Sequence, residues 1–404
     1  MKSQKYPPIL IHNLNIELIS KLCSYLSIKS LKNLSKSSSY ISRHLNSDLN
    51  FWQSACKLNL PTVLECKNVL KTKYKLFRNI KSGSNESSYT FITHQKDITY
   101  LKIHDKYVYT SSDDTTMKQF SFSGVLINTF LGHKGGIWSF SVDKVLVTGS
   151  TDKTAIIWDM ASGIPLHKLK GHTNTVRVVK TYGDYVCTGG RDCFIRIWNL
   201  IGECLFILSG HTSSVRCLDI NRDFLLSGSY DGSVVLWDYK KGKRCFNLVS
   251  HKSRVYSVLL GKKYIISGGL DAFVHISTFD NKLVTRYKCH DILVISLSFS
   301  HAERYLVSSA ADNILVKWDV LDNKKEYTIN EKCLITSHFI YEELLFLTTI
   351  NELQVYDYET GLFIRTVMKA DKFIKVEMYE DKLIVAYLLQ KNYHIKIYTY
   401  TNNS

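Results

Sequence analysis

Three short stretches of the sequence share one pattern: TGSTDKTAIIWD at 148–159, TGGRDCFIRIWN at 188–199 and SGSYDGSVVLWD at 227–238. In each stretch small residues precede an aspartate, and a short apolar run then ends on a tryptophan. Alternation such as Ile195 and Ile197 against Phe194 and Arg196 is typical of a β-strand with one buried face. The pattern therefore predicts a turn that leads into a strand, repeated along the chain.

Weaker copies of this pattern extend over most of the chain. TSSDDTTMKQFS ends at residue 121, SGGLDAFVHIST at 278 and SSAADNILVKWD at 319, and two degenerate copies, TTINELQVYD and IKIYTY, end at 357 and 400. The tryptophan position falls at residues 120, 158, 198, 237, 277, 318, 356 and 398, in steps of 38 to 42 residues. A nearly constant step of this length indicates an array of similar structural units.

A histidine lies upstream of five copies, and the whole pattern reads Gly-His, then Asp, then Trp-Asp. It resembles the WD-repeat family over residues 89 to about 400, which implies an all-β propeller with four short strands in each blade. Eight copies predict eight blades, with Tyr89–Ile92 as the outer strand that closes the ring. Seven blades remain an alternative, because the last two copies lack the histidine and the tryptophan. The histidine pairs are Gly132-His133, Gly171-His172, Gly210-His211, Ser250-His251 and Cys289-His290.

The recurring histidine, threonine and aspartate could suggest a catalytic triad. A working triad is one arrangement in one place, whereas His172, Thr188, Asp192 and Trp198 have counterparts in several copies. We therefore expect a buried hydrogen-bond network in each blade, whose polar groups satisfy one another. The ten cysteines are scattered singly, without Cys-x-x-Cys or Cys/His spacing. The sequence predicts a non-catalytic chain without a metal site or cofactor.

The first part of the chain has helical rather than strand periodicity. Leucines recur every four residues from Leu14 to Leu26, and Phe51-Trp52 follows a further helical segment. Residues 1–58, with a core at 10–56, resemble an F-box that lacks the usual proline near its start; a generic three-helix bundle is the alternative. Residues 59–88 are predicted to form a basic helical linker and a loop. The resemblance implies contact with the adaptor of an SCF ubiquitin ligase through Leu14, Glu17, Leu18, Leu22, Leu26, Leu31, Leu34 and Trp52.

Composition narrows the class of protein further. The 404 residues are 45% hydrophobic and 22% charged, which is typical of a globular protein. No stretch has the roughly 18 apolar residues of a membrane span, and we expect residence in the nucleus or the cytoplasm. The formal net charge is +16, of which +10 falls on residues 1–88. This excess predicts an acidic partner, which is a nucleic acid, a phosphorylated protein or an acidic binding protein.

Alignment of the copies defines three positions that hold four of the twelve arginines, in consecutive repeats: Arg177 and Arg216 at the first, Arg254 at the second and Arg191 at the third. Equivalent positions in a closed ring form rings of side chains, and the resemblance to WD-repeat propellers implies that these three positions lie on one face, around the mouth of the central channel. Converging arginines with aromatic neighbours are the usual means of reading phosphorylated motifs, because the guanidinium fork binds two phosphate oxygens at once. The candidate binding residues are Trp138, Thr151, Thr175, Arg177, Arg191, Arg216, Tyr230, Arg254 and Tyr256.

The stretches around these residues resemble F-box/WD-repeat substrate receptors of the cell-division-control type. That resemblance implies binding of phosphothreonine followed by proline, with the phosphate on Arg177, Arg191 and Arg216 beside Tyr230, and the proline on Trp138. The expected partners are the SCF adaptor, its cullin scaffold and phosphorylated substrates, and we expect a monomeric receptor. Two alternatives fit the same sequence: a WD-repeat propeller that binds RNA or DNA, and a scaffold with a degenerate F-box.

Overall fold

The computed structural model describes residues 63–400 except 85, 249, 289 and 301–302, and these form two compact units. One contains a helix, and the other is the propeller, Ser87–Thr399. The residues predicted to bind the SCF adaptor, from Leu14 to Trp52, lie outside the described residues. No helix in the described part of the chain combines the length and the apolarity that a membrane crossing needs.

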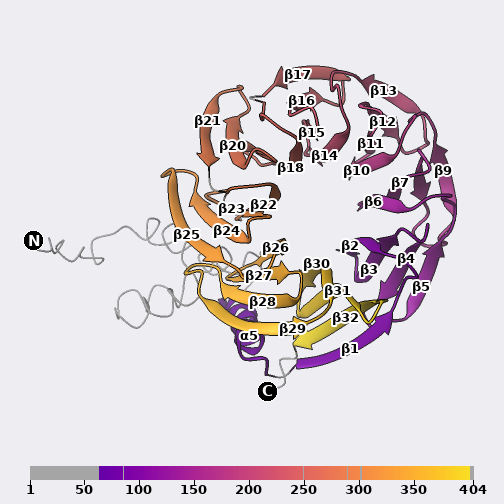
Figure 1. The fold of residues 1–404 in the computed structure, drawn as a ribbon. Coiled ribbons are helices and arrows are strands. Elements are labelled where there is room, and N and C mark those ends of the chain that lie inside the picture. The colour runs from indigo at the N-terminus through magenta and orange to yellow at the C-terminus, as the bar shows by residue number, and fades with distance from the viewer. Residues whose placement is uncertain (1–62, 85, 249, 289, 301–302, 401–404) are drawn as a thin grey trace, which may run out of the picture. The chain divides into compact units, whose positions relative to one another are not determined.

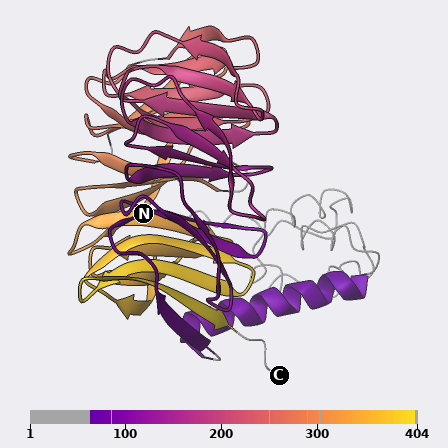
Figure 2. The same ribbon diagram turned by 90° about the vertical axis from the view of Figure 1, so that its right-hand side faces the viewer.

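The helix α5 spans Val63–Ser82 and is continuous over its length (Figure 2). It lies within the stretch for which the sequence predicts a helical linker. Four basic side chains, Lys73, Lys75, Arg78 and Lys81, follow one another on its second half. Gly83 comes directly after its last residue with a φ of 68°, a left-handed conformation that commonly ends helices.

The propeller consists of eight four-stranded antiparallel sheets arranged in a ring (Figure 1). In seven of these sheets all four strands are consecutive in the chain and pair in that order, so each of these blades runs from the channel to the rim. The innermost strands are β2 (Ile98–His104), β6 (Ile137–Val142), β10 (Val176–Tyr182), β14 (Val215–Ile220), β18 (Val255–Leu260), β22 (Val294–Phe299), β26 (Ile335–Tyr341) and β30 (Lys372–Tyr379). The second strands are β3 (Tyr107–Ser112), β7 (Leu146–Ser150), β11 (Tyr185–Gly190), β15 (Leu225–Ser229), β19 (Tyr264–Gly269), β23 (Tyr305–Ala310), β27 (Leu344–Thr349) and β31 (Lys382–Leu389).

The third strands carry the repeated tryptophan position, and the fourth strands form the rim. The third strands are β4 (Met117–Ser121), β8 (Ala155–Trp158), β12 (Ile195–Asn199), β16 (Val234–Asp238), β20 (Phe273–Thr278), β24 (Ile314–Asp319), β28 (Glu352–Asp357) and β32 (Asn392–Tyr400). The fourth strands are β5 (Leu126–Phe130), β9 (Pro165–Leu169), β13 (Cys204–Leu208), β17 (Lys243–Asn247), β21 (Leu283–Lys288), β25 (Lys324–Asn330), β29 (Phe363–Lys369) and β1 (Glu86–Ile92).

The ring is closed by β1, which joins the last three strands of the propeller in the order β1-β32-β31-β30. In Figure 1, β1 and β32 lie side by side although they are far apart in the sequence. The prediction of eight blades closed by an early strand is therefore confirmed. The closing strand begins at Glu86, three residues before the predicted Tyr89, so the linker and loop predicted for residues 59–88 end earlier than we predicted. Closure leaves no open edge between the first and last blades.

The degenerate last two repeats form blades because they keep the apolar alternation of the others. Leu345, Leu347 and Ile335 are fully buried in one apolar cluster of the seventh blade, and Ile384 and Ile397 in another at the last blade. The histidine and tryptophan are thus dispensable for a blade whose faces are covered by its neighbours. Burial of apolar surface supplies the main driving force.

Side chains that line the channel also tie neighbouring blades together. The carboxylate of Asp219 accepts a hydrogen bond from the backbone N–H of Leu260 in the next blade, at 2.9 Å. Glu377 accepts one in the same way from Ile103, at 2.8 Å, across the point where the ring closes. Because the backbone donors belong to the next innermost strand, these bonds fix the stagger between blades.

Candidate anion-binding site

A buried hydrogen-bond network organises six of the blades. In the third blade, Nε2 of His172 lies 2.8 Å from Oγ1 of Thr188, and its Nδ1 lies 2.9 Å from the carboxylate of Asp192. The indole N–H of Trp198 donates to the same Thr188 hydroxyl at 2.9 Å. Equivalent histidine–hydroxyl contacts recur in the other five, from His94, His133, His211, His251 and His290. This recurrence identifies the network as structural, as the sequence predicts, and it adds His94 of the first blade, which the repeat pattern missed.

The network controls the charge state of its aspartates. Burial by itself would raise the pKa of Asp271, but hydrogen bonds from His251 and from two backbone N–H groups outweigh it and lower that pKa to about 2. The same opposing causes lower the pKa of Asp192. Both aspartates therefore remain carboxylates at neutral pH. Each holds the turns of its own blade by accepting hydrogen bonds from backbone N–H groups.

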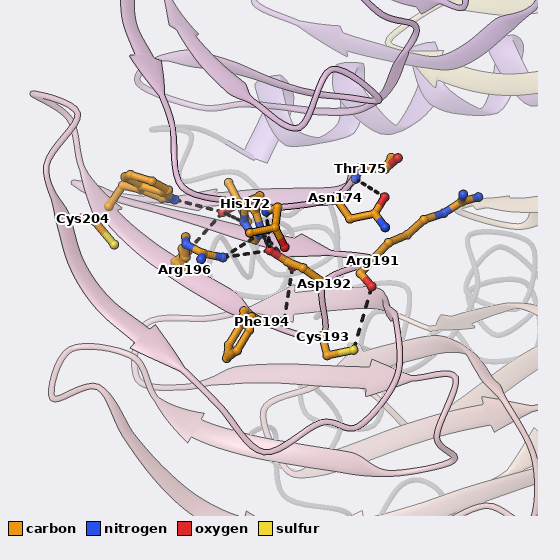
Figure 3. A network of polar contacts seen from close by, with 12 residues as sticks. His172, Asn174, Thr175, Arg191, Asp192, Cys193, Phe194, Arg196 and Cys204 are labelled. Carbon is orange, nitrogen blue, oxygen red and sulfur yellow. Dashed lines mark hydrogen bonds and ion pairs between the residues drawn. The ribbon is translucent and has the colours of Figure 1, made fainter.

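Two nearby arginines of the third blade have different environments (Figure 3). Arg196 is buried, and its Nη1 lies 2.9 Å from Nδ1 of His172 and 3.2 Å from the carboxylate of Asp192. In other blades a hydroxyl donates to the equivalent aspartate, as Thr154 does to Asp152, and in the third blade Arg196 takes the place of this hydroxyl. Arg191 extends away from this network and is exposed. The structure thus assigns Arg196 to the blade and leaves Arg191 available to a ligand.

One backbone hydrogen bond, repeated in seven blades, defines the ring of turns around the channel mouth. In the third blade the N–H of Arg191 donates to the carbonyl of Thr175, at 2.9 Å. The same bond joins the residue before the turn of each of these blades to a residue that precedes its innermost strand. The pairs, donor first, are Asp113–Asp97, Thr151–Gly136, Arg191–Thr175, Tyr230–Ser214, Leu270–Arg254, Ala311–Leu293 and Ile350–Leu334.

Four arginines and three aromatic rings form one continuous cluster at this mouth. The guanidinium carbon of Arg177 lies 4.8 Å from the centroid of the Trp138 ring and 5.5 Å from that of Tyr230. A hydrogen bond of 3.2 Å joins Nη2 of Arg177 to the Tyr230 hydroxyl. Three further contacts of this kind complete the cluster: Arg191 on Trp138 at 5.5 Å, Arg254 on Tyr230 at 5.1 Å and Arg216 on Tyr256 at 5.8 Å.

Contact between two tyrosines, Tyr230 and Tyr256, links the two parts of this cluster. The ring centroids of Tyr230 and Tyr256 lie 5.3 Å apart, and the two rings come from adjacent blades. A cation over an aromatic face is stabilised by the negative centre of the ring. The aromatic side chains therefore hold the guanidinium groups in place without neutralising them.

None of these four arginines forms an ion pair with a carboxylate in the part of the chain that the structure describes. By contrast, Arg304 lies 2.7 Å from Asp319 and Arg196 lies 3.2 Å from Asp192. Burial lowers the pKa of Arg177, and the positive charges of Arg216 and Arg191 lower it further against the opposing effect of Tyr230. The mouth is thus a region of uncompensated positive charge.

Three buried donors at the mouth make no hydrogen bond to a described residue: Nε of Arg177, Nε of Arg216 and Oγ of Ser214. Buried polar groups are nearly always satisfied in folded proteins, so a local group of exceptions indicates a missing ligand or water. The sequence places Ser214 in the ring of turns but gives no reason to single it out.

In the second blade the turn at the mouth has a glycine, Gly136, next to Asp113 of the first blade. An added Cβ at Gly136 would lie 2.3 Å from Oδ1 of Asp113 and 3.1 Å from its Cα, so a larger residue there would require Asp113 to shift. The indole N–H of Trp138 donates to the Asp113 carboxylate, whose pKa is raised by burial and by the nearby Asp97. Trp138 is therefore anchored at its edge, and its ring lies against two arginines.

The remaining predicted residues lie in the same ring of turns. Thr175 is buried and Thr151 is half-buried, and in the described part of the chain no side-chain contact joins either to the arginines. On the other side of the cluster the turns become apolar, with Leu270, Ile292 and Ile350 between 36% and 46% exposed. The mouth thus passes from cationic to apolar as the ring is followed from the third to the seventh blade.

One group of side chains has the composition of a metal site but not its geometry. Ligand atoms of His251, Asp271 and His275 lie within 4.8 Å of one another. The two imidazole rings are stacked 3.9 Å apart with 7° between their planes. A ring nitrogen binds a metal in the plane of its ring, and two parallel planes do not share a point for one ion. His275 occupies in the fifth blade the position of Arg196 in the third; it stacks on the network histidine His251, whereas Arg196 makes a polar contact with His172.

Comparison with known families identifies the repeats. The family described as "WD domain, G-beta repeat" matches residues 124–159, 163–199, 202–238 and 281–319. Each matched segment begins near the outer strand of one blade and ends with the third strand of the next. These four segments are WD repeats. The offset between repeat and blade means that each WD repeat spans two neighbouring blades, which joins the blades into one ring.

Known proteins share this propeller to different extents. Cell division control protein 4 of Saccharomyces cerevisiae is 27% identical over 348 residues, which cover 72% of this chain and 44% of that protein. The WD repeat-containing protein pop1 of Schizosaccharomyces pombe is 32% identical over 105 residues, 19% of this chain and 14% of that protein. The chain therefore spans less than half the length of these curated relatives. A computationally designed protein, Ika8, has a crystal structure that matches 76% of this chain and 97% of its own, with a TM-score of 0.70 at 22% identity, and so shares the fold.

Proposed function

We propose that this chain is the substrate-recognition subunit of an SCF-type ubiquitin ligase and that its WD-repeat propeller binds phosphothreonine–proline motifs. The observation that carries the proposal is the cluster of four arginines without carboxylate partners at the channel mouth. Such charges repel one another, and a bound dianion removes that repulsion. A compact site of this kind fits one phosphate group better than an extended nucleic-acid backbone, which needs a broad basic surface.

The peptide would contact both the cationic and the apolar part of the mouth. Its phosphate would lie on Arg177, Arg191 and Arg216, and the following proline on the ring of Trp138. An aliphatic side chain on the other flank of the phosphate would meet the apolar turns of the fifth to seventh blades. The chain itself would do no chemistry; it would raise the local concentration of the substrate at the ligase. The resemblance of residues 10–56 to an F-box supports the link to the ligase.

The first test is peptide binding to the full-length protein. Fluorescence anisotropy would compare a phosphothreonine–proline peptide with its unphosphorylated twin. We expect a clear preference for the phosphopeptide, and a loss of about 2–5 kcal/mol in Arg177→Ala, because one partner of a desolvated charge pair is removed. The matched control is Arg244→Ala, which removes the same charge from the outer strand β17 and should bind like the wild type. Equal binding of the two peptides would refute the proposal, and steep salt dependence without phosphate preference would favour a nucleic-acid partner.

The second test addresses the ligase. The purified SCF adaptor should co-purify with the full-length chain, and Leu18→Asp should abolish this while phosphopeptide binding persists. A charge on an apolar helical contact face is expected to prevent docking, because the aspartate would be buried without a partner. If the wild-type chain does not retain the adaptor, the chain is a phosphopeptide-binding scaffold outside the ligase.

A further inference from the structure

Ser214 differs from every other residue in the ring of turns. Its hydroxyl oxygen is buried and has no hydrogen-bond partner among the described residues. A buried hydroxyl without a partner destabilises the folded state, because it has lost its hydrogen bonds to water. Other hydroxyls of the same blade are used: Ser227 bonds His211 and Trp237, and Ser233 bonds Asp231. The fold alone therefore gives no role to the Ser214 hydroxyl.

Backbone and side-chain hydrogen bonds of Tyr230 connect Ser214 to the arginine cluster. Its carbonyl accepts the N–H of Tyr230 at 3.0 Å, and the hydroxyl of the same tyrosine is bonded to Arg177 at 3.2 Å. Arg216 follows two residues later on β14, and its Nε is also buried without a partner. The three unsatisfied donors therefore lie on β10 (Arg177), on β14 (Arg216) and at the residue before β14 (Ser214). Arg177 and Ser214 both bond Tyr230, and Arg216 contacts Tyr256, whose ring centroid lies 5.3 Å from that of Tyr230.

We infer that the Ser214 hydroxyl is a further ligand-binding group, which donates a hydrogen bond to an oxygen of the phosphate held by Arg177 and Arg216. The inference rests on the proposed function and adds a residue to the same site. A hydroxyl can donate to a phosphate oxygen at short range and, unlike a fourth guanidinium, adds no repulsion to the free site. The three donors would be satisfied together when the anion binds.

The experiment measures peptide binding and thermal stability for the same variants of the full-length chain. Ser214→Ala should weaken the phosphothreonine–proline peptide by roughly tenfold to a hundredfold, as expected for a hydrogen bond to a charged group. Its binding of the unphosphorylated twin should not change. Its melting temperature should equal or exceed that of the wild type, because the substitution removes an unsatisfied buried hydroxyl. If the Ser214 hydroxyl had only a structural role, Ser214→Ala would instead lower the melting temperature and leave phosphopeptide binding unchanged.

Two variants at the same position and one elsewhere serve as controls. Ser214→Thr keeps the hydroxyl and should bind like the wild type, since Thr175 occupies the equivalent position of the third blade. Ser214→Gly should behave like the alanine variant, and Gly136 demonstrates that the turn forms without a side chain. Ser233→Ala removes a bonded hydroxyl from the same blade, so it should lower the melting temperature and leave phosphopeptide binding unchanged.

The outcomes separate the inference from the proposed function. If the wild type prefers the phosphopeptide but Ser214→Ala binds it equally well, the hydroxyl has another partner, such as water, and the inference fails alone. The inference also fails if Ser214→Ala loses stability without losing affinity. If the wild type does not distinguish the two peptides, the proposed function itself is wrong.

Discussion

The repeated tryptophans offer an internal comparison of one buried hydrogen bond. In the third blade the indole N–H of Trp198 donates to Thr188 at 2.9 Å, and the ring is 3% exposed. In the sixth blade the N–H of Trp318 is buried without a partner, and the ring stacks on Tyr287 with centroids 4.1 Å apart. Replacement of each tryptophan by phenylalanine removes an N–H that is used in one blade and unused in the other.

The two substitutions should therefore differ in their effect on stability. Trp198→Phe loses a hydrogen bond worth about 1 kcal/mol net, whereas Trp318→Phe removes an unsatisfied donor that costs about 1–3 kcal/mol. Both substitutions remove a similar area of aromatic ring. Trp198 is more completely buried than Trp318, which also makes Trp198→Phe the more destabilising substitution. We expect Trp198→Phe to be the less stable variant by about 2–4 kcal/mol. Differential scanning calorimetry of both proteins, under one set of conditions, measures the order and the size of the gap.

A third variant tests the generality of this reasoning. Trp237 also donates to a serine, Ser227, at 2.8 Å, so Trp237→Phe should resemble Trp198→Phe. Near-ultraviolet circular dichroism would report whether the phenylalanine at 318 keeps its contact with Tyr287. A Trp318→Phe variant that loses as much stability as the other two would show that its N–H is satisfied, and the reasoning would be refuted.

Two predictions concern pH and ring closure. The lowered pKa of Asp271, about 2 in the folded state, stabilises the protein above the ordinary aspartate pKa near 4, and this contribution is lost as the pH falls from about 4 to about 2. The difference in melting temperature between the wild type and Asp271→Asn should accordingly be full at pH 7 and shrink below pH 4; a constant difference would contradict the assignment. Phe91 of β1 packs on Phe120 with centroids 4.9 Å apart, so Phe91→Ala should cost about 1–3 kcal/mol and speed proteolysis near the ring closure. The exposed Ile92 is the control, and an equal effect of Ile92→Ala would argue against closure by this strand.

Much of the fold and of the candidate site could be predicted because each blade repeats the same local signals. The step between tryptophan positions gave the number of blades, and alignment gave the two rings of mouth residues that a repeated backbone bond now joins. Alignment also separated Arg191 from Arg196, since one precedes the turn aspartate and the other lies within a strand. Equivalent positions of adjacent blades are neighbours in a closed ring, and the four arginines belong to consecutive blades, so their order in the sequence already predicted a cluster.

Tertiary structure decided which of these side chains have partners. No local signal distinguishes Trp318 from Trp198, or the hydroxyl of Ser214 from that of Ser233, because hydrogen bonding depends on atoms contributed by other strands and blades. The start of β1 at Glu86 was missed for a similar reason: ESS has little strand propensity, and its pairing with β32 overrides that preference. The sequence by itself determined how many blades form and which residues face the mouth. Only the packed ring determined which donors at that mouth lack a hydrogen-bond partner, because the atoms that could accept the bond belong to other strands and blades.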